Sequence, residues 1–153
     1  MSDNSPTREA VTCAIRHIGT GIYSSGKIKL YLIQKGYSED VSLSAVKHLT
    51  GYIDDMRASR KVLAARSGKK QESRQYICKR LLEAGIDPVC ADEIVATLGS
   101  DTDTCLSLFE ASFGKCSGED YSDREEEFLR LAALRGYSLE TARSAFKSFC
   151  KEC

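Results

Sequence analysis

Few residues of this chain are of the types that usually bind metals or catalyse reactions, and few of these are spaced so that they could act together. Cys150 and Cys153 form a Cys-x-x-Cys pair near the C-terminal end, but a structural zinc ion needs four ligands, usually from two such pairs. His17 and His48 show no metal-ligand spacing. The seven cysteines are odd in number and lack paired spacing, which argues against a disulfide framework. We expect no metal and no cofactor. Four cysteines fall in helical patterns as small hydrophobic residues: Cys13, Cys78, Cys90 and Cys105.

No arrangement of residues typical of catalysis is found. Gly68-Lys69-Lys70 lacks the first glycine and the hydroxyl residue of a GxxxxGK[ST] phosphate loop. The acidic run 123–127 could supply carboxylates to a metal, but it fits better as a solvated first helical turn, where the helix dipole favours negative charge. A Cys–His or Ser–His pair stays open, although no local pattern supports one, and His48 is expected at the surface. We predict that the chain is not an enzyme and acts by binding.

Basic residues are concentrated in one part of the chain. Residues 51–80 contain nine Lys/Arg and three Asp/Glu, a net charge of +6, whereas residues 81–153 have a net charge of −8. Lys69, Lys70 and Arg74 are expected to open a helix, where positive charge opposes the dipole and so indicates a function. We predict a surface for a polyanion or an acidic partner, with a merely solvated face as the alternative. The candidate contact residues are Arg57, Arg60, Lys61, Arg66, Lys69, Lys70, Arg74, Lys79 and Arg80.

The elements that would position these residues repeat about every fifty residues. Three similar segments begin at Gly36, Gly85 and Gly136. Each glycine follows an apolar helical run, where a left-handed position after the helix favours glycine. Two residues after each glycine stands a residue that can cap the next helix: Ser38, Asp87 and Ser138. The repeated unit is therefore a helix, a glycine turn and a capped helix.

A further helix fits before each of these pairs, at about 7–19, 54–66 and 101–113, with Asp54 and Asp101 as expected N-caps of the last two. We predict an all-α fold of three tandem three-helix repeats, 1–52, 53–99 and 100–153, forming an elongated, curved helical array. A polar linker is expected at 114–122. No apolar run approaches the ~20 residues of a membrane span, and the N-terminus lacks an apolar signal region. We expect a cytoplasmic protein.

The order of these features resembles the RecX family, the bacterial regulators of RecA recombinase. Residues 51–57, Gly-Tyr-Ile-Asp-Asp-Met-Arg, are similar to that family's Gly-Tyr-Leu-Asp-Asp-x-Arg junction between its first two repeats. A basic helix and the Gly-Lys-Lys turn at 68–70 follow, and residues 80–87 resemble the family's Leu-x-x-Lys-Gly-Ile-Asp. The resemblance extends from about residue 8 to 150.

This resemblance implies a negative regulator that binds the RecA–single-stranded DNA filament and reduces its ATPase, strand exchange and extension, in DNA repair and homologous recombination. The implied partners are the RecA nucleoprotein filament and single- and double-stranded DNA, with no membrane, and the chain is expected to be a monomer. Two alternatives stay open: a DNA-binding protein independent of RecA, and a helical-repeat scaffold for another acidic protein. Tyr76 is the one aromatic residue near the basic segment, which argues against a stacking platform for single strands there.

Overall fold

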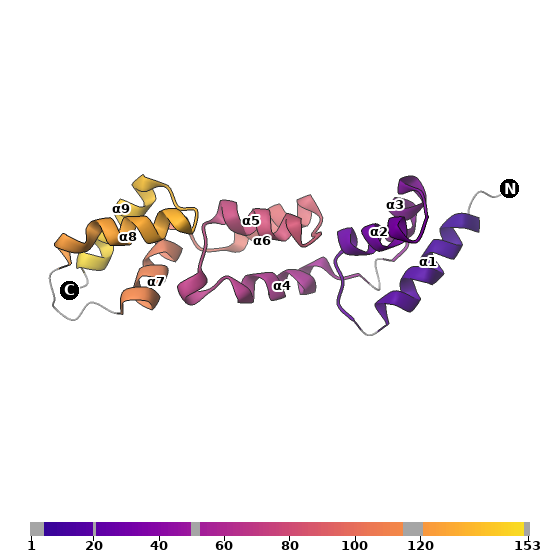
Figure 1. Cartoon of the computed structure of the whole chain (residues 1–153), viewed down its shortest axis with the longest axis horizontal. Helices are drawn as coiled ribbons and strands as arrows, with labels where there is room; N and C mark the ends of the chain where they lie inside the picture. The colour runs from indigo at the N-terminus through magenta and orange to yellow at the C-terminus, as the bar shows by residue number, and fades with distance from the viewer. Residues whose placement is uncertain (1–4, 20, 50–52, 115–120, 152–153) are drawn as a thin grey trace. The chain divides into compact units, whose positions relative to one another are not determined.

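The computed structural model describes residues 5–19, 21–49, 53–114 and 121–151, and these residues form helices and no strand (Figure 1). The all-α prediction is confirmed. In chain order the elements are α1 (Ser5–Ile18), α2 (Ser25–Gln34), α3 (Glu39–Lys47), α4 (Asp55–Ala65), the 3-10 helix η1 (Gly68–Lys70), α5 (Arg74–Glu83), α6 (Pro88–Thr97), α7 (Asp101–Phe113), the 3-10 helix η2 (Ser122–Arg124), α8 (Glu125–Leu134) and α9 (Leu139–Lys151).

The chain divides into two compact units, which we describe separately. Unit 1 comprises Met1–Val62 and Leu81–Asp92, and unit 2 comprises Leu63–Arg80 and Glu93–Cys153. The unit boundaries fall inside α4, α5 and α6, so they differ from the predicted repeat boundaries after residues 52 and 99, which we keep as a proposal. The helices nevertheless follow one another in the order expected of tandem three-helix repeats.

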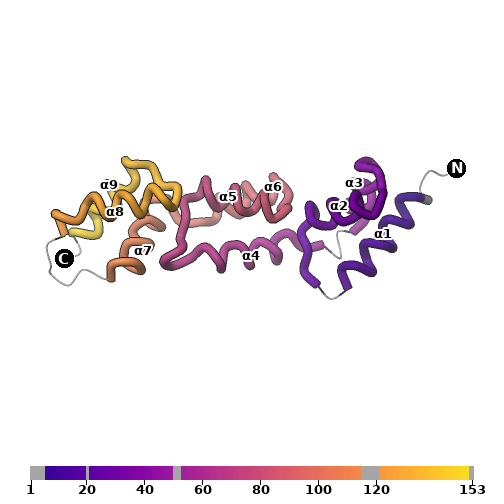
Figure 2. Tube along the Cα trace, in the orientation of Figure 1, coloured from indigo at the N-terminus to yellow at the C-terminus, as the bar shows by residue number. Residues whose placement is uncertain are grey.

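Each unit has its own apolar core. In unit 1, α1, α2 and α3 contact one another and bury small and branched side chains, among them Ala14, Ile28 and Leu32. In unit 2, α7 and α8 both pack on α9 (Figure 2), and Phe128 lies 4.9 Å from Phe109 and 5.0 Å from Phe149 between ring centroids.

The glycine turns have the predicted geometry at all three positions. Gly36, Gly85 and Gly136 have φ of 104°, 84° and 88°, in the left-handed region. After α2, the Tyr37 N–H donates to the Leu32 carbonyl at 3.1 Å and the Gly36 N–H to the Ile33 carbonyl at 3.0 Å. The same pair of bonds closes α5 and α8, so each helix ends in a Schellman motif.

The capping predictions are confirmed with one exception. Ser38, Asp87 and Ser138 each accept an N–H from the first turn of the following helix, and Asp54 accepts the Arg57 N–H at 3.0 Å. The expectation for Asp101 was wrong.

The N-cap of α7 is Ser100, whose Oγ accepts the Asp103 N–H at 3.2 Å. Asp101 is already in the helix, and its carboxylate accepts the Arg74 N–H at 2.9 Å instead.

A similar polar joint lies in each unit. In unit 1, the Gly26 N–H donates to the Gly85 carbonyl at 2.8 Å, and the Asp55 carboxylate accepts from the Ser25 N–H at 2.8 Å, the Ser25 hydroxyl at 2.9 Å and the Asp87 N–H at 3.1 Å. Asp55 therefore holds the first turns of α2 and α6 on the first turn of α4.

In unit 2, the Ser73 N–H donates to the Arg135 carbonyl at 3.0 Å, and Asp101 binds the first turn of α5 as described above. Gly136 lies so close to the Tyr76 ring that an added Cβ would stand 2.5 Å from it. The glycine turn of one helix pair is therefore packed against the start of an earlier helix.

Within the described part of the chain, no helix is long and apolar enough to cross a membrane, and no three His, Cys, Asp or Glu side chains converge as metal ligands. Cys105 is buried, and the other described cysteines are half-buried; all five are free thiols: Cys13, Cys78, Cys90, Cys105 and Cys150. Gly51, Tyr52, Cys116, Cys153 and most of the predicted linker at 114–122 lie outside the described residues.

Candidate partner-binding surface

Three of the predicted contact residues share one face of α4. Arg57, Arg60 and Lys61 are exposed and are spaced i, i+3, i+4, which places them on one side of the helix. The opposite side carries the buried Ser59 and the half-buried Val62. In unit 1, α4 thus presents three positive charges to solvent.

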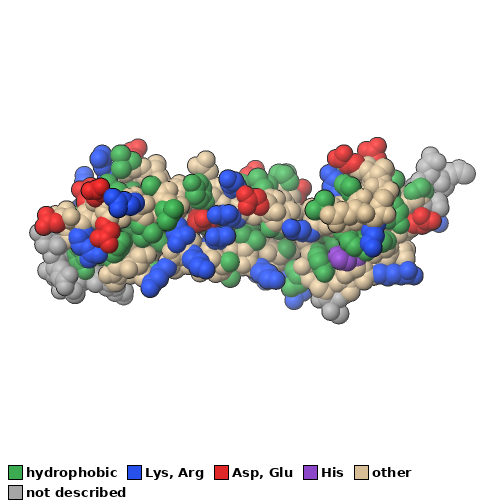
Figure 3. All heavy atoms as spheres, viewed as in Figure 1, with side chains coloured by type: hydrophobic (Ala, Val, Ile, Leu, Met, Phe, Trp, Pro, Cys, Tyr) green, Lys and Arg blue, Asp and Glu red, His purple; other side chains and the backbone are tan. Residues whose placement is uncertain are grey.

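Lys69, Lys70 and Lys79 are the exposed cations of the segment that belongs to unit 2. The expectation that Lys69 and Lys70 open the next helix was wrong, because they form the separate 3-10 helix η1 and α5 begins at Arg74. Figure 3 shows Lys and Arg side chains exposed over α4 and over α5.

Arg74 does begin α5, but its side chain is engaged within unit 2. The Arg74 guanidinium donates from Nε to the Gly99 carbonyl at 3.1 Å and from an Nη to the Leu98 carbonyl. These carbonyls follow the end of α6 at Thr97, where a positive charge is favoured by the helix dipole. The positive charge of Arg74, which is unfavourable at the start of α5, is therefore placed favourably at the end of α6.

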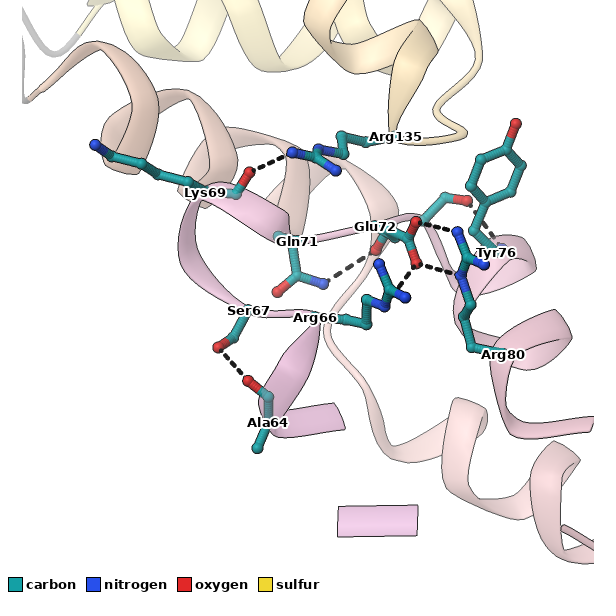
Figure 4. A network of polar contacts seen from close by, with 10 residues as sticks. Ala64, Arg66, Ser67, Lys69, Gln71, Glu72, Tyr76, Arg80 and Arg135 are labelled. Atoms are coloured by element: carbon teal, nitrogen blue, oxygen red, sulfur yellow. Dashed lines mark hydrogen bonds and ion pairs between the residues drawn. The ribbon is translucent and has the colours of Figure 1, made fainter. Parts of the chain in front are cut away.

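Arg66 and Arg80 are engaged by a buried carboxylate (Figure 4). Glu72 is 3% exposed, and its two oxygens lie 3.3 Å from Nε and Nη2 of Arg80, while Oε1 lies 3.8 Å from Nε of Arg66. The Arg80 and Arg66 side chains keep 36% and 31% of their surface exposed. A buried carboxylate needs such partners, because an unpaired charge in the interior is strongly unfavourable.

The nine predicted contact residues therefore separate into two groups. Internal partners engage Arg66, Arg74 and Arg80. The other six are exposed, and the described residues supply no carboxylate partner to any of their side chains: Arg57, Arg60, Lys61, Lys69, Lys70 and Lys79.

The acidic run at 123–127 behaves as a solvated helix start. Glu125, Glu126 and Glu127 lie in the first turn of α8. Arg124 donates to Glu127 at 3.1 Å, and this bond lowers the pKa of the Glu127 carboxyl. Arg130 pairs with Glu126 at 3.2 Å on the exposed helix surface. Glu126 and Glu127 are thus each paired with an arginine on the helix surface.

Two residues with clear roles were not identified from the sequence. Glu72 is the only acidic residue between Arg57 and Arg80. Its isolation among nine cations was the one feature of the sequence that could have indicated its role. Asp55 accepts three hydrogen bonds from two other helix starts, and its sequence neighbourhood gives no sign of this role.

No protein-family model matches the chain. The fold is similar to a crystal structure of RecX from Lactobacillus salivarius, with a TM-score of 0.68, 13% identity, and coverage of 94% of this chain and 96% of that one. The chain is 25% identical over 152 residues to a protein of Pelodictyon phaeoclathratiforme named regulatory protein RecX, which covers 96% of this chain and 92% of that protein. These matches confirm the resemblance of the chain to the RecX family.

A second relative with the name regulatory protein RecX, from Leuconostoc citreum, is 22% identical over 139 residues. This match covers 88% of the chain but 52% of the longer Leuconostoc protein. The RecX similarity thus extends over nearly the whole chain and includes both compact units.

The described residues of the RecX-like motifs have structural roles in this chain. Asp54 caps α4, Asp55 forms the joint of unit 1, Gly85 closes α5, and Asp87 caps α6. The motifs that carry the RecX resemblance therefore build the fold, whereas the exposed cations are other residues of α4, η1 and α5.

Proposed function

We propose that this chain binds the RecA–single-stranded DNA filament and acts as a negative regulator that inhibits its ATPase, strand exchange and extension. The observation that carries the proposal is the similarity, over 96% of the chain, to a protein named regulatory protein RecX. We further propose that the chain does this in the cytoplasm, as a monomer, and in contact with the DNA as well as with RecA.

The proposed contact residues form two sets, Arg57, Arg60 and Lys61 on α4 in unit 1, and Lys69, Lys70 and Lys79 on η1 and α5 in unit 2. Their charges are free to meet an acidic surface of the filament or the DNA phosphates, and clustered positive charge accelerates association with such a partner. Arg66, Arg74 and Arg80 are left out of this surface because their guanidinium groups are already bound inside unit 2.

We propose a binding role rather than catalysis. The largest upward pKa shifts belong to the Cys105 thiol and the Tyr137 phenol, and burial is the main cause of both. Both side chains belong to the apolar core of unit 2. Perturbed groups that support catalysis lie instead in an accessible cleft, beside a partner that can exchange a proton with substrate.

A paired charge reversal tests the contact surface. Arg57 and Lys61 on α4 have a matched pair in Arg143 and Lys147 on α9, since both pairs are exposed and spaced i, i+4. We expect R57E/K61E to lose inhibition of the RecA ATPase on single-stranded DNA, and R143E/K147E to keep it. Circular dichroism should show the same helix content for both variants.

The proposed surface is wrong if R57E/K61E inhibits RecA as the unmodified chain does, or if both variants lose inhibition equally. A chain that leaves the RecA ATPase untouched, yet shifts bare DNA with an affinity that falls steeply with salt, would be a RecA-independent DNA-binding protein. A chain that does neither would favour the scaffold alternative.

A further inference from the structure

An exposed aromatic stack lies on unit 1, outside the basic segment. The His17 ring on α1 stacks on the Tyr31 ring on α2, with 3.7 Å between ring centroids and 9° between ring planes. Tyr23, just before α2, lies 5.0 Å from His17 at a tilt of 40°. His17 is exposed, whereas Tyr31 and Tyr23 are half-buried. Tyrosine thus supports an imidazole ring that remains open to solvent.

Tyr23 and Tyr31 pack against the apolar core that joins α1 to α2. That core is formed by buried aliphatic side chains, including Ala14, Ile18 and Ile28. The Tyr31 phenol is held by the Cys13 thiol, whose Sγ donates to the Tyr31 Oη at 3.9 Å. The contact with Cys13 raises the pKa of Tyr31, whose ordinary value of about 10 already leaves the phenol uncharged at neutral pH.

Three cationic side chains lie on the Tyr31 side of the stack. Lys35 Nζ lies 5.5 Å from the centroid of the Tyr31 ring, and Arg8 and Arg16 line a hollow that Tyr31 also lines. Glu9 is the only acidic residue lining that hollow within the described chain. No described carboxylate pairs with Arg8, Arg16 or Lys35. Figure 3 shows a histidine side chain with Lys and Arg side chains near it over α1 and α2.

We propose that His17 and Tyr31, with Arg16 and Lys35, form a binding site for single-stranded nucleic acid. An unpaired base would stack on the exposed His17 ring, and the cations would meet the neighbouring phosphates. Bases of single strands are bound in this way by aromatic side chains with adjacent positive charge, because every base has a π-face. Paired bases inside a duplex do not expose that face. An acidic peptide would satisfy the cations but would leave the exposed His17 ring without a role.

The test measures binding of two labelled probes by fluorescence anisotropy: a short oligothymidylate and an abasic oligonucleotide of the same length. We expect His17→Ala to weaken oligothymidylate binding about 5- to 150-fold, the range for loss of stacking on one base. His17→Phe should retain most of the affinity because it keeps an aromatic face. The control is His48→Ala, which removes the other exposed histidine, at the end of α3, and should change nothing.

The abasic probe separates stacking from charge. It should bind the unmodified chain and His17→Ala equally, whereas Arg16→Gln should weaken binding of both probes. Equal affinity of His17→Ala and the unmodified chain for oligothymidylate would overturn the proposal. So would polyglutamate that competes as well as the oligothymidylate, since that result would indicate an acidic protein segment. These measurements contain no RecA, so their outcome is independent of the proposed RecA inhibition.

Discussion

Removing Arg80 is the most direct test of the internal role assigned to the Glu72 carboxylate. Arg80 offers Nε and Nη2 to the two Glu72 oxygens, each at 3.3 Å. In Arg80→Ala, the 3% exposed Glu72 side chain would keep only Arg66 as a counter-charge, and at the longer distance of 3.8 Å. The variant should therefore leave a buried carboxylate that is poorly compensated.

The expected cost follows from the burial of the two partners. Breaking a fully buried ion pair by removing one partner costs about 3–5 kcal/mol. The Arg80 side chain is 36% exposed, so water screens part of the interaction, and we expect Arg80→Ala to lower the free energy of unfolding by about 2–3 kcal/mol. Arg66→Ala removes the weaker contact and should cost roughly 1 kcal/mol.

The measurement is urea unfolding followed by circular dichroism, with Arg143→Ala as the matched control. Arg143 is exposed on α9, and its removal should change the free energy of unfolding by no more than about 0.5 kcal/mol. The double variant Glu72→Gln/Arg80→Ala should lose about 1–2 kcal/mol less stability than the sum of the losses in the two single variants, because the residues are in contact.

Two results would refute this reasoning. In the first, Arg80→Ala is as stable as Arg143→Ala, which would mean that Glu72 is solvated without its arginine. In the second, the Glu72 and Arg80 effects add fully, which would mean that the two side chains do not interact. Either result would also return Arg80 to the set of side chains available to a partner.

Three further predictions follow from the turns, the joint and the core. Gly36→Ala should lower the free energy of unfolding by about 1 kcal/mol, because of the left-handed backbone alone. Gly136→Ala should lower it clearly more in the same urea assay, because an added Cβ meets open space at Gly36 but the Tyr76 ring at Gly136. Asp55→Ala should cost more than the ~1 kcal/mol of a lost N-cap, since three donors lose their acceptor; a loss of 1 kcal/mol or less would contradict the joint. Burial raises the pKa of Cys105 to about 12, so the stability it contributes is full below its unfolded pKa of about 8.5 and falls as pH rises toward 12; mass-spectrometric alkylation at pH 8 should spare Cys105 in the folded chain and label it in urea.

Local features could be predicted well from the sequence because they depend on residues a few positions apart. The Schellman turns at Gly36, Gly85 and Gly136 need only a glycine after an apolar helical run. The same holds for the caps at Ser38 and Asp54, whose side chains bind backbone groups three residues ahead. The wrong prediction of an N-cap at Asp101 shows where such local prediction ends. Ser100 caps α7, and the Asp101 carboxylate binds the first turn of α5, which is distant in sequence.

The candidate surface could be predicted only as a segment rich in charge. Residues 57–80 contain nine cations, and the sequence does not distinguish Arg80 from Lys79. That distinction depends on the burial of Glu72, which is a property of the packed unit. The stack of His17 on Tyr31 was not anticipated for the same reason: the two rings come from different helices and meet only when α1 packs on α2.

The sequence by itself determined the three glycine turns, most of the helix caps and their common order, because helix caps and glycine turns are governed by short-range hydrogen bonds and backbone conformation. Only the tertiary structure decided which charges face solvent and which are bound inside, because a partner such as Glu72 or the carbonyl groups after α6 reaches Arg80 or Arg74 through packing. Whether a basic residue stabilises the fold or is free to bind a partner is therefore a three-dimensional property, set by the distance to the nearest buried acceptor.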